Sequence, residues 1–361
     1  MALRVEAVAG RAAAKEFVTF RDRVYASRAV RWPSFEVLDL PILLGEGPFA
    51  EGRRVRPLVV RDGRDVVARA AACIDGPYQQ YWNEPTLGHF LFFEALPGTR
   101  VAVRMLVDAA SEWLASEGVA TMRAGMGLFE MPFVIDDYDS LPPNILRHNP
   151  AYYHGLLKDA GFETVRGFVD YKVAVWPELV TRWQAMIDAV PRAEFSLVPL
   201  RAVAETERGR VVADVLNDAF RAHWGYVPTS AVEQDLLNRL FEGTGFLDTT
   251  AIAFRGTEPV GQCYVVPEAS GFAATAPGRA IRDDERLNFL GIGLRPSARG
   301  RGLATAMAAW GYVALARRGA RWLSYTLVLD DNWPSRRTAE KLGAEVCASY
   351  VAYERTISRA G

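Results

Sequence analysis

The stretch RGRGLA at residues 299–304 alternates two arginines with two glycines and leads directly into a long helical pattern. Glycine has no Cβ, so it permits a tight turn and lets a ligand approach the main chain. The first N–H groups of a helix lie at the positive end of its dipole, and a row of them can wrap a phosphate or diphosphate. The sequence therefore predicts an anion site; the alternative is a glycine turn with solvated arginines. The predicted site consists of Arg299, Gly300, Arg301, Gly302, Leu303 and Ala304.

Two motifs in the second half of the chain resemble those of the GNAT acyltransferases. Arg299-x-x-Gly302-x-Ala304 matches the Q/R-x-x-G-x-G/A signature of that family and follows a strand that ends at Leu294. The stretch DNWPSRRTAEKLGAEV, which contains Asn332, resembles the family's Asn-x-x-Ser/Ala … Leu-Gly motif. Six further stretches resemble a bacterial group with two GNAT lobes in one chain. They are HWGYVP, LVLDDN and SYVAYER in the second half, and RWPSF, FLFFE and NPAYYHGLLKDAGFE in the first.

The resemblance implies an acyl-coenzyme A co-substrate, with acetyl-CoA as the default. Its diphosphate would lie on the backbone N–H groups of residues 301–304, its pantetheine arm would pair with the strand at Ile292 and Leu294, and Asn332 would contact it. An amine acceptor would attack the thioester directly, and a main-chain N–H of that strand could stabilise the oxyanion. The amine also needs a base or a water relay, and the departing thiolate benefits from an acid.

The sequence offers alternatives for the acid and the base. The family often carries a tyrosine seven residues after the asparagine, where this chain has Ala339. Tyr350 and Tyr353 could replace that tyrosine, but their alternation also fits a half-buried strand. Asp330 ends a strand beside the expected thioester and is a candidate base, with a turn or helix-capping role as the alternative.

Two aromatic stretches could bind the acceptor. Trp224 and Tyr226 in HWGYVP lie where GNAT proteins place acceptor-side helices, although buried aromatics at a helix end would look the same. PYQQYWNEP, at Pro77–Pro85, could stack on an acceptor, but a plain loop whose aromatics cover the core is the better interpretation.

These residues require a mixed α/β framework that occurs twice. Strand-like and helical segments alternate in the same order in both halves, and each half has a short helix that ends in glycine, at Gly161 and at Gly343. The region from Pro33 to Pro48 is rich in turn residues, and Ser230 with Glu233 forms a capping-box pattern. We expect tandem GNAT-like lobes, each a mixed twisted sheet flanked by helices.

The predicted boundaries are a degenerate first lobe at 1–176, a helical connector at 177–194 and a catalytic lobe at 195–361. The first lobe has ALPGTRVAVRML where the second has its glycine motif, so we expect it not to bind coenzyme A in the standard way. It would form one wall of the acceptor cleft.

Composition excludes several other classes. The 361 residues contain 42 basic and 43 acidic side chains, which gives no reason to expect nucleic-acid or membrane-surface binding. Three scattered cysteines and four histidines without ligand spacing predict neither disulfides nor a metal site. No apolar run approaches the roughly 20 residues that a membrane span needs. We therefore expect a cytoplasmic protein, with a homodimer left open.

The leading prediction is an enzyme, a GNAT-type N-acyltransferase that transfers acetyl to a small-molecule or natural-product amine. A non-catalytic acyl-CoA sensor is the second hypothesis, because Ala339 replaces the usual tyrosine. A two-lobed aminoacyl-tRNA-dependent transferase is the third, and the glycine cradle and balanced charge argue against it.

Overall fold

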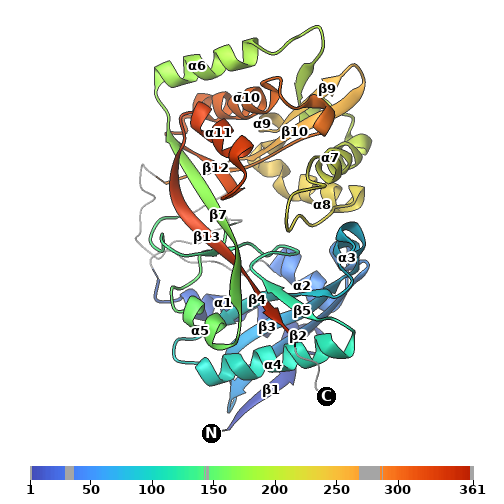
Figure 1. Cartoon of the computed structure of the whole chain (residues 1–361), viewed down its shortest axis with the longest axis vertical. Coiled ribbons are helices and arrows are strands. Elements are labelled where there is room, and N and C mark those ends of the chain that lie inside the picture. Colours follow the sequence, from blue (N-terminus) through green and yellow to red (C-terminus); the bar gives the residue numbers. More distant parts are fainter. Residues whose placement is uncertain are drawn as a thin grey trace.

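The computed structural model describes residues 2–28, 36–141, 143, 146–267, 285–286 and 288–357. Both halves of the chain fold as strands flanked by helices, and they lie at opposite ends of the molecule (Figure 1). The elements of the first half are β1 (Leu3–Ala7), α1 (Gly10–Tyr25), α2 (Glu36–Leu44), β2 (Arg53–Asp62), β3 (Asp65–Asp75), α3 (Gly76–Trp82), β4 (Leu87–Ala95), α4 (Arg100–Ser116), β5 (Thr121–Ala124), β6 (Phe133–Val134), α5 (Tyr153–Asp159) and β7 (Glu163–Ala174).

The second half repeats the main elements of this order after a connecting helix, α6 (Pro177–Asp188); α9 (Phe246–Thr249) is additional, and α3 and β6 have no counterpart among its described residues. Ser230 and Glu233 form both hydrogen bonds of the predicted capping box at the start of α8. The remaining elements are β8 (Ser196–Pro199), α7 (Glu205–Ala219), α8 (Ala231–Phe241), α9 (Phe246–Thr249), β9 (Ala251–Arg255), β10 (Glu258–Val266), β11 (Phe289–Leu294), α10 (Leu303–Arg317), β12 (Trp322–Leu329), α11 (Trp333–Lys341) and β13 (Glu345–Thr356).

The last strand of each half crosses into the other half. The larger sheet has the order β1-β2-β3-β4-β5-β13-β7-β12, with β6 also paired to β13. Thus β7 pairs with β12 of the second half, and the end of β13 pairs with β5 of the first. Figure 1 shows β7 and β13 side by side between the two ends of the molecule. The lobe boundaries stay a prediction, but each lobe contains a strand from the other half.

The second lobe has a separate sheet of order β11-β10-β9-β8. The strands β11 and β12, which would be neighbours in one continuous sheet, therefore share no ladder among the described residues. The helices α10 and α11 cover one face of this lobe, with α6 packed on α10, and α7 and α8 cover another (Figure 1).

Two segments differ from the sequence expectation. Residues 36–44 of the turn-rich stretch form α2, with Pro41 inside it, because Leu38, Ile42 and Leu43 bury their side chains against the first-lobe core. That burial outweighs the backbone hydrogen bond that proline cannot donate. Pro33 lies outside the described residues. Residues 76–82 form the helix α3 and not a plain loop, and the Asp75 side chain caps it by accepting from the Tyr78 N–H.

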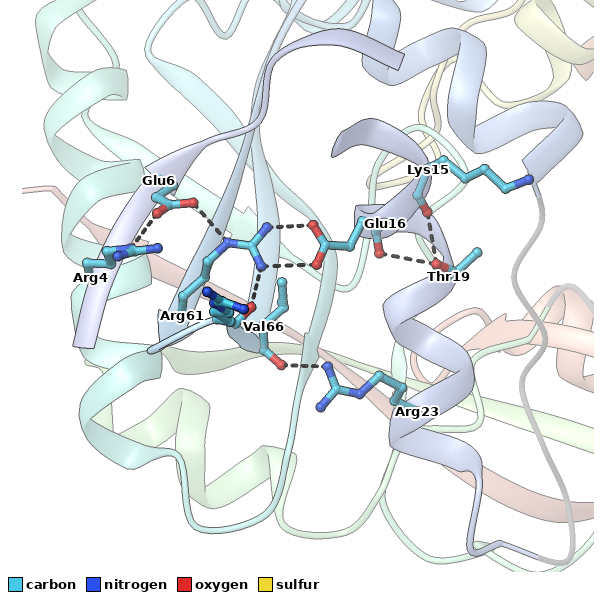
Figure 2. A network of polar contacts seen from close by, with 9 residues as sticks. Arg4, Glu6, Lys15, Glu16, Thr19, Arg23, Arg61 and Val66 are labelled. Atoms are coloured by element: carbon cyan, nitrogen blue, oxygen red, sulfur yellow. Dashed lines mark hydrogen bonds and ion pairs between the residues drawn. The ribbon is translucent and has the colours of Figure 1, made fainter. Parts of the chain in front are cut away.

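A surface network ties the first strand to the first helix. Figure 2 shows Arg61 of β2 between Glu6 of β1 and Glu16 of α1, to which it donates at 2.9 and 3.0 Å. This network joins β1, α1 and β2 at the end of the first lobe that carries the N-terminus (Figure 1). Among the described residues no helix combines the length and the apolar character that a membrane crossing requires.

Candidate functional site

The predicted cradle forms an open turn at the start of α10. Gly300 and Gly302 have φ angles of 79° and 74°, and a Cβ added to either would point into open space. Gly302 is the N-cap of α10, no side chain caps this end, and the first turn contains no acidic residue. The backbone N–H groups of the first turn are therefore available to an anion, and the 15-residue helix directs its dipole at them.

The two arginines of the cradle have different partners. Arg299 folds back, and its guanidinium donates to the carbonyl oxygens of Leu294 at 3.2 Å and of Ala219 at 2.8 Å. Arg301 is half exposed and pairs with Glu194, which also lies 3.2 Å from Arg255. Arg299 therefore fixes the turn to β11 and α7, and the anion-binding groups that remain are mainly backbone N–H groups.

The strands β11 and β12 form a fork whose inner end is closed by side chains. Asn288 exchanges two hydrogen bonds with the backbone of Ser324, at 2.8 and 3.2 Å. Two residues further along both strands, the Leu290 N–H donates to the Thr326 hydroxyl at 3.1 Å. Residue 288 faces 324 and residue 290 faces 326, so the two strands run parallel. No backbone ladder joins them among the described residues, and we take the stretch beyond Leu290 as the open part of the fork.

The open part of the fork leads to the cradle. Backbone N–H groups alternate sides along a strand, so those of Ile292 and Leu294 point the same way as that of Leu290, into the gap. An extended molecule anchored at the turn 300–302 would run along this edge toward Thr326. Gly293 of β11 faces the end of α7, where an added Cβ would lie 3.0 Å from the side chains of Ala219 and Phe220.

A strained residue lies at the inner end of the fork. Leu327 has a φ of 42°, which is unusual for a residue with a side chain. The pairing of β12 with β7 shifts register between Tyr325 and Val328, so this is a bulge. The Leu327 N–H donates to the carboxylate of Asp170, a completely buried residue of β7, at 3.3 Å. The other carboxylate oxygen of Asp170 pairs with Arg286.

The predicted base and the predicted asparagine lie at the other end of β12. Asp330 is exposed at the open end of the fork, beyond Leu329, and its carboxylate packs on Gly167. Asp330 therefore lies past the end of β12, beyond Thr326, and its role as the base stays a prediction. Asn332 caps α11 by accepting from the Ser335 N–H at 3.3 Å. Ala339 is fully buried in the second-lobe core.

The two candidate tyrosines on β13 lie in different environments. Tyr353 is in the first-lobe core, its hydroxyl lies 2.6 Å from His154 Nδ1, and burial raises its pKa to about 12. This placement argues against Tyr353 as the acid of the second lobe. Tyr350 is buried among inter-lobe apolar residues that include Phe168 and Val134, and burial raises its pKa well above the usual value. It stays a candidate.

Trp224 and Tyr226 lie where the two lobes meet. The Trp224 ring packs under the guanidinium of Arg123, a first-lobe residue, with 4.3 Å between the guanidinium carbon and the ring centroid. Tyr226 stacks on Phe220 and donates to the Asn217 side chain at 2.8 Å. Trp224 therefore borders the inter-lobe cluster that contains Tyr350, whereas Tyr226 braces α7.

The helix α3 joins the lobes and does not form a free acceptor loop. The indole N–H of Trp82 donates to the Tyr226 carbonyl at 2.8 Å, and the Tyr81 hydroxyl donates to the Asn217 carbonyl at 2.7 Å. Beside it, a groove of about 580 Å³ lies between the lobes. Its walls include Tyr81 and Gln80 of α3 and the residues that begin α8.

In the first lobe the strand that corresponds to β11 is β4, and side chains occupy its edge. Among the described residues β4 pairs with β5 only as far as Phe90. Beyond that point, first-lobe side chains occupy the β4 backbone. Glu130 accepts from the Phe92 N–H, Arg147 donates to the Phe93 carbonyl, Tyr153 accepts from the Ala95 N–H, and Tyr152 donates to the Ala95 carbonyl, at 2.7–3.1 Å.

Sequence reasoning missed the polar side chains that shape the fork. Ser324 and Thr326 alternate within the buried strand WLSYTLVL, and Asp170 interrupts the apolar strand GFVDYKVAV. A polar residue inside an otherwise apolar strand was the available signal.

Among the described residues no three His, Cys, Asp or Glu side chains are arranged to hold a metal ion.

Comparison with known proteins finds a family match in part of the chain. Residues 212–344 match the model of the acetyltransferase (GNAT) family. A bacterial ceramide synthase of Caulobacter vibrioides is 27% identical over 185 residues, and protein YghO of Escherichia coli is 21% identical over 222 residues. These alignments cover 49% and 59% of this chain and 46% and 55% of the relatives, so the chain matches about half of each relative's length.

Solved structures agree with the fold. A tandem GNAT protein from the clavulanic acid biosynthesis pathway superposes over 100% of both chains with a TM-score of 0.58 and 16% identity. A GCN5-related N-acetyltransferase from Sphaerobacter thermophilus gives a TM-score of 0.52 at 14% identity, covering 98% of this chain and 96% of that one. At these identities the likeness is one of fold.

Proposed function

We propose that this chain is an acyl-CoA-dependent N-acyltransferase. The premise is that it is a two-lobed GNAT protein whose residues 212–344 match the acetyltransferase (GNAT) family. The observation that carries the proposal is the continuity of two open backbone surfaces. The uncapped N-terminus of α10 leads into the unpaired edge of β11, where Ile292 and Leu294 direct their N–H groups. A diphosphate joined to an extended amide-containing arm fits both surfaces.

The glycine turn fits a diphosphate sterically. The space beside Gly300 and Gly302 is empty, so a phosphate can reach the backbone without meeting a side chain. We propose that the donor binds only in this lobe, because Glu130, Arg147 and Tyr153 occupy the β4 edge of the first lobe. The first lobe would then contribute one wall of the acceptor site.

The proposed reaction is direct attack of a small-molecule amine on the thioester carbonyl. The C–N bond forms, the C–S bond breaks, the amine loses a proton, and the thiolate takes one up. The N–H of Ile292 is the nearest open donor beyond the fork's inner end and is our candidate for stabilising the oxyanion. Tyr350 is our candidate for the acid, because it lies in the inter-lobe cluster that also includes Leu327 of β12.

Calorimetric titration with acetyl-CoA and longer acyl-CoAs tests the cradle. We expect one site per chain and at least a tenfold weaker affinity in Gly302→Asp, about 1.4 kcal/mol, because the new carboxylate would repel the diphosphate. Gly319→Asp is a matched control, because Gly319 is also exposed, has a φ of 91° and lies at the opposite end of α10. Equal affinity in wild type and Gly302→Asp, both folded, would contradict the cradle.

Release of free coenzyme A on addition of amines separates a transferase from a sensor that only binds acyl-CoA. The screen should include small primary amines and natural-product amines. It should also include the amine from which a ceramide is made, since one relative bears the name ceramide synthase. Binding without turnover across such a screen would favour the sensor.

A further inference from the structure

Asp170 is a charged residue on β7 whose side chain is completely buried. Its carboxylate contacts the segments that lead into both arms of the fork. One oxygen accepts from the N–H of Leu327, the bulged residue of β12, and the other pairs with buried Arg286, which comes two residues before Asn288 at the inner end of the fork. One carboxylate therefore bridges the two arms at the point where they separate.

The strand exchange brings Asp170 to this place. Residue 170 belongs to the first half of the chain, and it reaches the second-lobe fork because β7 pairs with β12. The second half alone would lack this carboxylate.

We propose that Asp170 is a positioning residue for acyl transfer, which sets the separation of β11 and β12 where the thioester would lie. The inference rests on the proposed function. Asp170 itself does not need to touch the donor. It acts through the Leu327 bulge. The bulge holds the hydroxyl of the neighbouring Thr326 where it accepts a hydrogen bond from the Leu290 N–H.

A purely structural role is the alternative, and energetics weigh against it. A buried ion pair is weak evidence for stability, because the cost of desolvating both charges offsets much of their attraction. A positive φ at a leucine also costs free energy and persists only where surrounding contacts enforce it. At Leu327 this contact is the hydrogen bond to the Asp170 carboxylate. The strained backbone and the buried charge therefore lie together at the inner end of the fork.

The test compares Asp170→Asn and Asp170→Ala with a matched buried carboxylate elsewhere. Glu94 of β4 is 1% exposed, pairs with Arg21 at 3.3 Å and accepts from the Tyr153 hydroxyl at 2.6 Å, but it lies in the first lobe. Glu94→Gln therefore controls for the loss of a buried charge away from the fork. The measurements are acyl-CoA affinity, kcat and KM, and hydrogen exchange of residues 324–329.

We expect both Asp170 variants to bind acyl-CoA within about twofold of wild type while kcat falls at least tenfold, more in Asp170→Ala than in Asp170→Asn. Exchange at Leu327 should accelerate in Asp170→Ala, which loses both contacts. Glu94→Gln should keep its kcat. An unchanged kcat in folded Asp170→Asn, or an equal loss in Glu94→Gln, would overturn the proposal.

The experiments distinguish failure of the transferase proposal from failure of the Asp170 proposal. If the wild-type protein releases no coenzyme A with any amine, the transferase proposal fails. Hydrogen exchange still decides the role of Asp170 in that case. Faster exchange at Leu327 in Asp170→Ala, with Glu94→Gln unchanged, supports the role in holding the fork, and unchanged exchange in all variants overturns it.

Discussion

The arginines of the motif RGRG have separate roles that their spacing alone could not reveal. Arg299 donates to two main-chain carbonyls from different elements, Leu294 of β11 and Ala219 of α7. Arg301 pairs with Glu194 in a half-exposed position. A hydrogen bond from a charged group to a carbonyl contributes about 1.5–3 kcal/mol, whereas an exposed ion pair contributes about 0–1 kcal/mol. The two residues should therefore respond differently to substitution.

We predict that Arg299→Ala weakens acyl-CoA binding and lowers the free energy of unfolding by about 1.5–3 kcal/mol, because two carbonyls lose their donor. Arg301→Ala should lower it by no more than about 1 kcal/mol. Urea unfolding and calorimetric titration of both variants measure this difference. Equal losses in the two variants would mean that Arg299 does not hold the turn.

At the scale of elements, β2 carries two arginines that each bridge two carboxylates in different surroundings. Arg61 is near the surface, between Glu6 and Glu16, as Figure 2 shows. Arg53 is buried between Asp75 of the first lobe and Glu233 of α8, at 3.0 and 2.8 Å, so it ties the two lobes together. The two sites share chemistry and strand but differ in burial and in what they join.

We predict that Arg53→Ala costs about 3–5 kcal/mol, because two buried carboxylates lose their counter-charge. Arg61→Ala should cost about 1 kcal/mol or less, and added salt should reduce that cost. Chemical unfolding at low and high ionic strength measures both values. A cost for Arg53→Ala as small as that of Arg61→Ala would mean that the Arg53 cluster does not hold the lobes together.

Sequence reasoning identified most elements because their signals are local. The glycine turn before α10 and the capping box at Ser230 depend on residues that are neighbours in sequence. The pairing of β7 with β12 depends on which of several similar apolar strands lie side by side, and periodicity contains no such information. The sequence pointed to the strand edge at Ile292 and Leu294 only through the family resemblance, and the Asp170 contact was not predicted.

At the scale of the whole molecule, the exchanged strands join the two lobes through one hydrogen-bonded sheet, while β8 to β11 form a separate sheet in the second lobe. The path from β1 to β12 crosses from the first half through β13 and β7. A separate group of buried side chains, which includes Phe168, Tyr350 and Val134, lies between the lobes. Both halves therefore contribute to the walls around the fork, and opening it by moving one lobe as a unit would break strand pairing.

Histidines in both lobes are buried or half-buried, and their burial predicts how stability depends on pH. Burial lowers the pKa of His89 to about 3 and that of His148 to about 4, and it also lowers those of His154 and His223. An unfolded histidine titrates near about 6.5. Between these values the unfolded chain binds more protons than the folded one, so stability is complete above about pH 6.5 and falls as pH decreases.

We predict that His89 contributes up to about 1.4 kcal/mol per pH unit to this loss between about pH 6 and pH 4. His89→Leu should flatten the dependence of the unfolding free energy on pH by that amount. Neither ring nitrogen of His89 has a hydrogen-bond partner among the described residues, and the same is true of both side-chain amide atoms of buried Asn238. Asn238→Leu is therefore a matched control that removes an unpartnered polar group without removing a proton site. Urea unfolding at several pH values should show a changed slope in His89→Leu alone; an identical slope in all three proteins would mean that His89 is not held neutral by the fold.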